Sequence, residues 1–140
     1  MSIFIFVEKK SNMHKTSITI GITFAGLSVI LGAFGSHALK DKLELPLLQV
    51  FETAVRYQMY HALALIILGF VADKLNIQFA SYSTYLFIAG IILFSGSLYL
   101  ISCKSILGIE SWKFLGPITP LGGLCFILAW LMFLISYLKK

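Results

Sequence analysis

Charged side chains are scarce in this sequence, and long polar stretches are missing. Of its 140 residues only 12% are charged and 59% are hydrophobic, and the mean hydropathy is +0.92. Soluble domains carry about 25% charged residues, so the composition excludes an ordinary water-soluble globular domain. The chain is also too short to hold several membrane spans and a separate soluble catalytic domain. Any function therefore lies in a membrane-embedded bundle or in its short loops.

Several chemical signatures are also absent. The two cysteines, Cys103 and Cys125, form no CxxC pair of the kind that indicates zinc or a redox motif. No GxSxG sequence marks a nucleophilic hydrolase, and we expect the protein not to be an enzyme. The 11 basic residues lie singly or in pairs at the edges of apolar runs. This pattern is typical of helix ends at lipid headgroups, and we expect no nucleic-acid partner.

Four apolar runs can cross a bilayer core of about 30 Å as helices. They lie at about residues 17–39, 57–72, 84–103 and 117–138, with charged or polar segments between them and a polar turn at about 76–83. Such short connections favour antiparallel neighbours. We therefore expect an all-α membrane protein, in which residues 13–140 form one domain, an antiparallel four-transmembrane-helix bundle.

The second helix is expected to begin well before its membrane span. Pro46 suits the first turn of a helix, and no helix breaker follows until Gly69. The first turns are amphipathic, with apolar residues such as Phe51 on one side and polar residues such as Glu52 on the other. This pattern predicts an interfacial extension of helix two that leads into the crossing.

Two further expectations concern the first span and the segment before it. Ser28, Gly32 and Ser36 recur every fourth residue, so they form a stripe that lets another helix approach closely. Residues 1–12 hold only a short apolar run that is followed by charges, which does not fit a signal peptide. We expect this segment to be a tail, either disordered or a start-site artefact with Met13 as the true first residue.

The distribution of basic residues gives a weak preference for one orientation. An even number of spans places both termini on one side of the membrane. Six basic residues lie on that side and five on the other: Lys9, Lys10, Lys15, Lys74, Lys139 and Lys140 against Lys40, Lys42, Arg56, Lys104 and Lys113. The positive-inside rule therefore favours cytoplasmic termini.

Unusual polar residues gather at the membrane face opposite the termini. This candidate polar cluster consists of His37, Glu52, Arg56, Tyr57, Tyr60 and His61. In helix two, several of its members are four residues apart and can meet on the helix surface. An ionisable residue about one turn below the interface, such as His61, is a functional candidate because hydrocarbon makes unpartnered polar groups costly. A second candidate motif lies at the entry to span four: Gly116, Pro117, Thr119 and Pro120.

The cluster also has a purely structural interpretation. Arg56 can extend to the headgroups, the tyrosines fit an aromatic belt, and a neutral His61 can hydrogen-bond across helices. Pairing His37 with His61 would suit axial haem ligation, but two histidines fall short of the three or four ligands of a zinc site. We therefore expect no metal and no cofactor, and keep a haem- or metal-binding protein as a remote alternative.

Four ordered motifs resemble the YgdD-like family of small multi-pass bacterial inner-membrane proteins, a family with a domain of unknown function. The motifs are residues 32–39, 51–64, 94–99 and 115–123, and the likeness extends over about residues 13–138. Ser36 stands where family members usually have alanine. The resemblance implies a location in the bacterial cytoplasmic (inner) membrane, and it implies no reaction.

These observations lead to one function and one main alternative. We expect a non-enzymatic binding or accessory protein whose polar cluster engages a lipid headgroup, a small solute, another membrane protein or a second copy of itself. The alternative is a small-solute or proton transporter or channel component lined by Arg56 and His61. Spans three and four carry no midplane charge, which disfavours a complete ion path in one chain.

Overall fold

The computed structural model describes the backbone of residues 2–140 and the side chains of residues 15–140. The tail expected at residues 1–12 lies outside the described side chains and stays a prediction. The chain is helical almost throughout, and residues 2–140 contain no β-strand. In chain order the elements are α1 (Ser2–Phe34), η1 (Gly35–Leu39), α2 (Leu45–Val71), η2 (Ala72–Lys74), α3 (Ile77–Gly90), η3 (Ile91–Ser95), α4 (Gly96–Ser102), α5 (Lys104–Leu107) and α6 (Leu115–Leu138).

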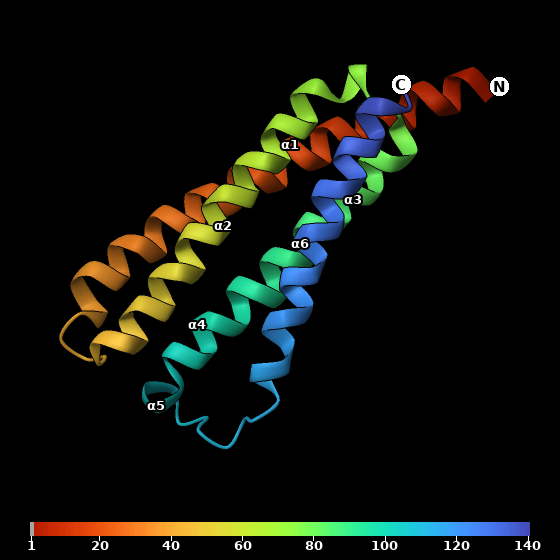
Figure 1. Cartoon of the computed structure of the whole chain (residues 1–140). Helices are drawn as coiled ribbons and strands as arrows, with labels where there is room; N and C mark the ends of the chain where they lie inside the picture. The colour runs from red at the N-terminus through yellow and green to blue at the C-terminus, as the bar shows by residue number, and fades with distance from the viewer. Residues whose placement is uncertain (1) are drawn as a thin grey trace.

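In the described part of the chain, four helices are long and apolar enough to cross a membrane. They are Lys15–Leu39, Leu45–Lys74, Ile77–Ser102 and Leu115–Leu138. This confirms the all-α, four-span prediction. The helices form two antiparallel hairpins, because the most extensive contacts join α1 to α2 and α3 to α6 (Figure 1). The second hairpin contacts the first mainly where η3 and α4 meet α2.

Helix two is a single helix from Leu45 to Val71, and Pro46 lies in its first turn as expected. The apolar side of these first turns packs against the end of the first span, where Phe51 joins Leu39 in a small core. The ring of Phe51 also lies 4.9 Å from that of Tyr99 on α4. The extension of helix two is therefore held by both of its neighbours.

The start of the third span differs from the sequence prediction. The polar turn expected at residues 76–83 is wrong, since α3 already begins at Ile77. The side chain of Asn76 caps it by accepting a hydrogen bond from the amide of Gln78 at 3.2 Å. Ser81 and Ser83 favoured the prediction of a turn. A serine also fits a helix when its hydroxyl donates a hydrogen bond to a carbonyl. That is the case at Ser83, which donates to the carbonyl of Ala129 at 2.9 Å.

Small residues on α1 do let α2 approach closely. Ser36, the third residue of the predicted stripe, is not one of them. Ser28 is fully buried and donates to the carbonyl of Val55 at 2.8 Å. A Cβ atom on Gly21 would lie 2.9 Å from the carbonyl oxygen of Ala62, so the two backbones nearly touch there. Ser36 is exposed, whereas Gly35 is buried. At 100° of rotation per residue, Gly35 lies within about 20° of Ser28 around the helix, whereas Ser36 lies about 80° away.

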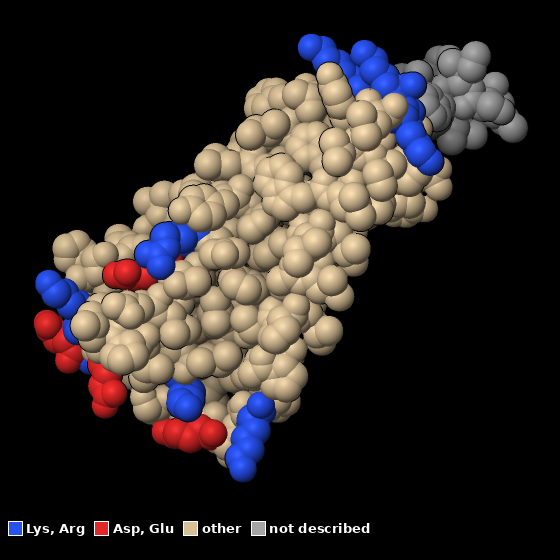
Figure 2. All heavy atoms as spheres, in the orientation of Figure 1, with Lys and Arg blue, Asp and Glu red and all other residues tan. Residues whose placement is uncertain are grey.

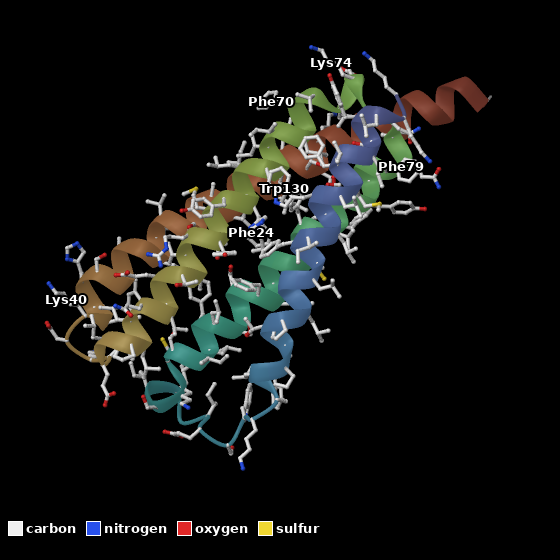
Figure 3. The ribbon with its side chains drawn as sticks, viewed as in Figure 1. Phe24, Lys40, Phe70, Lys74, Phe79 and Trp130 are labelled. Carbon is white, nitrogen blue, oxygen red and sulfur yellow. The ribbon has the colours of Figure 1, made fainter. Side chains whose placement is uncertain are left out.

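Hydrogen bonds between spans join the polar side chains of the described core. Ser17 on α1 lies 2.8 Å from Thr84 on α3, and Ser97 on α4 lies 2.7 Å from Thr119 on α6. Such bonds hold transmembrane helices together where no water competes. Figure 2 shows the complementary outer surface, on which charged side chains gather at the two ends and leave a broad uncharged belt. Lys40 and Lys74 lie at these opposite ends (Figure 3).

Candidate functional site

Five of the six residues in the candidate polar cluster lie on α2, and four of them follow one another around it. With 100° of rotation per residue, Arg56, Tyr60, Tyr57 and His61 cover a sector of about 140° in that order. The sector begins on the outer surface of the bundle and ends on the side that faces α6. The structure therefore turns the cluster into a strip that leads from the outer surface into the bundle.

The outer edge of this strip is an exposed ion pair. Arg56 Nη1 lies 3.7 Å from Glu52 Oε2, and the two side chains are 53% and 50% exposed. The other terminal nitrogen, Nη2, donates to the hydroxyl of Thr53 at 3.1 Å. These are the polar contacts of the guanidinium within residues 15–140, and they leave most of its five N–H donors without a protein acceptor.

The two tyrosines lie between the ion pair and the bundle interior. Both are exposed, and their ring centroids are 6.2 Å apart. The ring of Tyr57 also lies 4.6 Å from that of Phe94, which belongs to η3. The strip thus becomes increasingly aromatic as it approaches the second hairpin.

His61 ends the strip and is 6% exposed. Its ring stacks on Phe126 of α6, with centroids 3.5 Å apart and planes 6° apart. Nδ1 lies 2.8 Å from the carbonyl oxygen of Tyr57. Because a carbonyl only accepts, Nδ1 donates to it, and Nε2 keeps its lone pair. Within residues 15–140, Nε2 has no hydrogen-bond partner.

His61 is the centre of an aromatic seam between α2 and the second hairpin, formed by Tyr57, His61, Phe94, Phe126 and Trp130. The ring of Trp130 lies 6.4 Å from that of His61. Figure 3 places Trp130 on α6 where that helix passes α2. The backbones of α2 and α6 have no extensive contact, so these rings make the connection between the two hairpins on this side. Aromatic pairs at such separations stabilise packing beyond their buried area.

His37 takes no part in this arrangement. It lies in the π turn η1 and is exposed. In the described part of the chain, no hydrogen bond, ion pair or ring contact joins it to Arg56, His61 or Pro117. The role predicted for His37 stays a prediction, and the site that the structure assembles lies on α2.

The motif at the entry to span four serves helix packing in part. Pro117 lies in the first turn of α6, where a missing amide donor costs little, and Pro120 lies one turn further inside the helix. Thr119 faces α4 and shares the hydrogen bond with Ser97. Gly116 and both prolines are exposed on the outer surface.

Sequence reasoning missed a buried polar residue that bonds to two other spans. Gln58 is buried, donates from Nε2 to the carbonyl of Phe24 on α1 at 2.9 Å, and accepts at Oε1 from the hydroxyl of Tyr99 on α4 at 3.0 Å. It therefore joins three spans. The sequence could have indicated this role, because Gln58 lies about 200° around α2 from Arg56 and therefore on the opposite, buried side of the helix. Ser95 was also missed: its hydroxyl is fully buried and has no hydrogen-bond partner.

No metal site accompanies these groups in the described residues. Among them, no three histidine, cysteine, aspartate or glutamate side chains lie close enough together to hold a metal ion. Cys103 and Cys125 are both free and partly buried.

Comparison with known proteins places the chain in a family. Residues 31–123 match the family model described as "Protein of unknown function (DUF423)". The chain belongs to the DUF423 family. The matched range contains every residue of the polar cluster and of the span-four motif. The resemblance to an uncharacterised bacterial membrane family is thereby confirmed at that level.

Relatives of this DUF423 protein match nearly their whole length. UPF0382 membrane protein YwdK of Bacillus subtilis is 46% identical over 126 residues, which cover 89% of this chain and 98% of the relative. A UPF0382 membrane protein of Staphylococcus haemolyticus is 42% identical over 125 residues, covering 89% and 97%. These names describe membrane proteins of uncharacterised function. No solved structure matches the chain.

Proposed function

We propose that this DUF423 protein is a non-enzymatic binding or accessory protein of the bacterial inner membrane. In this proposal α2 engages an anionic, phosphate-bearing lipid headgroup through Arg56, and the exposed rings of Tyr57 and Tyr60 beside it contact the acyl chains. The observation that carries the proposal is the guanidinium of Arg56, which is half exposed and uses few of its donors within the protein. Guanidinium groups bind phosphate through two parallel, charge-assisted hydrogen bonds.

The depth of Arg56 supports a headgroup as the ligand. Lys74 marks the opposite end of the span, and 18 residues of helix separate it from Arg56. At 1.5 Å per residue this corresponds to about 27 Å, close to the thickness of the hydrocarbon core. Arg56 therefore lies near the boundary between acyl chains and headgroups, where lipid phosphates are within reach.

The ion pair with Glu52 does not compete strongly with such a ligand. At 3.7 Å, and with both side chains half exposed, the pair contributes at most about 1 kcal/mol. A phosphate oxygen can accept from nitrogens that face away from Glu52. The carboxylate then holds the guanidinium in place from the other side.

A thermal unfolding experiment with defined lipids tests this proposal. The purified protein in a neutral detergent is heated with added phosphatidylglycerol, phosphatidylcholine or inorganic phosphate. We expect phosphatidylglycerol to raise the Tm by several degrees more than phosphatidylcholine, since a ligand that binds only the native state stabilises it. The variant Arg56→Gln should lose this difference. The control Lys40→Gln, at the end of the first span, should keep it.

Two results would refute the headgroup proposal. The first is an equal Tm increase with phosphatidylglycerol in Arg56→Gln and the unsubstituted protein. The second is a response to inorganic phosphate as large as that to the lipid, which would indicate a soluble phosphate-bearing ligand.

The transport alternative has less support in the bundle. Its buried polar side chains are mostly bonded between helices, as Ser17 is to Thr84, and so do not form an open path. Proton flux into vesicles distinguishes the two functions. We expect the protein to give the same flux as protein-free vesicles, and a flux that disappears in His61→Ala would favour transport.

We also propose a membrane orientation for the chain and its assignment to a narrower protein group. We place both termini in the cytoplasm because of the slight excess of basic residues on that side. Fusing a phosphatase and a fluorescent protein to Lys140 in turn tests the orientation, since the first is active only outside the cytoplasm and the second only inside. We also assign the chain to the YgdD-like group on the motifs at residues 32–39 and 51–64.

A further inference from the structure

The connection between α4 and α6, residues 103–114, exposes apolar side chains outside the four spans. It contains the single-turn helix α5 and lies at the end of the bundle opposite the two termini (Figure 1). Four large apolar side chains are each about half exposed: Ile106, Leu107, Trp112 and Phe114. None of the residues in α5 is buried.

Backbone hydrogen bonds, rather than a core, keep this connection ordered. Gly108 ends α5 with a positive φ of 67°, and the amide of Ile109 donates to the carbonyl of Lys104 at 2.9 Å. The amide of Trp112 donates in turn to the carbonyl of Ile109 at 3.0 Å. The rings of Trp112 and Phe114 lie 5.4 Å apart, so the aromatic side chains gather at one place. An ordered segment thus displays apolar groups that the bundle does not cover.

The chemistry of the segment fits the border of a bilayer better than either water or a protein partner. Tryptophan beside lysine is typical of membrane interfaces, where the ring lies among headgroups and the ammonium reaches the phosphates. Lys104 precedes Ile106 and Leu107, and Lys113 lies between Trp112 and Phe114; Glu110 is the single acidic group between the two lysines. The helix that follows, α6, also exposes apolar side chains, at Leu121 and Leu124.

We propose that residues 103–114 form an interfacial anchor. Ile106, Leu107, Trp112 and Phe114 insert among the headgroups on the face opposite the termini, farther from the membrane centre than Arg56. Lys104 and Lys113 bind lipid phosphates at the same level. This anchor is independent of the headgroup site proposed at Arg56.

Tryptophan fluorescence tests the anchor directly. The chain has two tryptophans, so Trp130→Phe leaves Trp112 alone and Trp112→Phe leaves Trp130 alone. Each variant is reconstituted in vesicles of phosphatidylcholine and phosphatidylglycerol in which lipids carry bromine atoms near the headgroup or deep in the chain. Bromine quenches tryptophan only at close range, and acrylamide reports access from water.

The two tryptophans should respond in opposite ways. We expect Trp112 to be quenched about twofold more by shallow than by deep bromines, because indole rings prefer the interface. Trp130 is the matched control: it lies eight residues before the end of α6, about 12 Å inside that helix, and should respond more to deep bromines. Acrylamide should quench Trp112 much less than free tryptophan. The unsubstituted protein provides a check without any variant, since its emission should contain both components.

Two outcomes would overturn the anchor. If acrylamide quenches Trp112 as efficiently as free tryptophan and bromine has no effect, the connection projects into water. If neither bromine nor acrylamide reaches Trp112, protein covers it, and a contact with a second copy replaces the lipid contact.

Discussion

Replacing Gly122 with alanine should separate α6 from the third span. A Cβ atom at this position would lie 2.7 Å from the Cα of Phe94 and would also contact its backbone nitrogen. Real Cβ contacts are rarely shorter than about 3.4 Å, so the two helices must move apart by at least about 0.7 Å. The neighbour is backbone and cannot rotate away. From the usual effect of overpacking we expect a loss of about 1–3 kcal/mol of stability.

The adjacent glycine provides a matched control for this change. A Cβ at Gly123 would lie 3.8 Å from the ring of Phe94, an ordinary contact. Gly123→Ala should therefore be neutral or slightly stabilising, since alanine favours a helix by about 1 kcal/mol over glycine. Thermal unfolding in detergent, monitored by the loss of folded protein, measures both variants. Equal stability of Gly122→Ala and Gly123→Ala would refute the close approach of α6 to η3.

Five further substitutions at four buried polar positions are measured by the same unfolding assay. Ser95→Ala should leave the stability unchanged or raise it by about 1 kcal/mol, because the hydroxyl of Ser95 is buried without a partner. Ser28→Ala should lower the stability by about 0.5–1 kcal/mol, because it removes the hydrogen bond to α2. A larger loss in Ser95→Ala than in Ser28→Ala would contradict these assignments. Gln58→Leu should cost about 1–2 kcal/mol, since it leaves the hydroxyl of Tyr99 unpaired, and an unchanged Tm would show that this bond is absent. His61→Phe should keep the ring stacked on Phe126 of α6 and so retain most of the stability. His61→Ala should lower the stability by about 2–4 kcal/mol, because it opens a cavity. Equal losses of stability in the two variants would argue against stacking as the structural role of His61.

Hydropathy was sufficient to predict the four spans because each crossing must bury about 20 residues in hydrocarbon. The ends of the spans were less predictable where polar side chains form hydrogen bonds within the helix bundle. Ser83 looked like part of a turn, yet its hydroxyl bonds a carbonyl of α6. A repeat of four residues also drifts around a helix that has 3.6 residues per turn, by about 40° at each step. Ser36 consequently leaves the face that Ser28 and Gly32 share.

The candidate site could be predicted only within one helix. Spacing along α2 places Arg56, Tyr57, Tyr60 and His61 in one sector of the helix, since residues close in sequence keep their relation on a helix. It could not predict which residues of α6 meet them, and the stack of His61 on Phe126 depends on how the two hairpins pack. The unpartnered hydroxyl of Ser95 depends on the same packing.

Arg56 and Gln58, two residues apart on α2, show why stability and binding should be separable in this protein. Gln58 faces inward, and both ends of its amide are bonded to other spans. Arg56 faces outward, and its donors have few acceptors in the described chain. In the function proposed above, lipid phosphates supply the acceptors for these remaining donors. Changes at Gln58 should therefore lower the Tm in any lipid, whereas changes at Arg56 should alter only the response to anionic lipid.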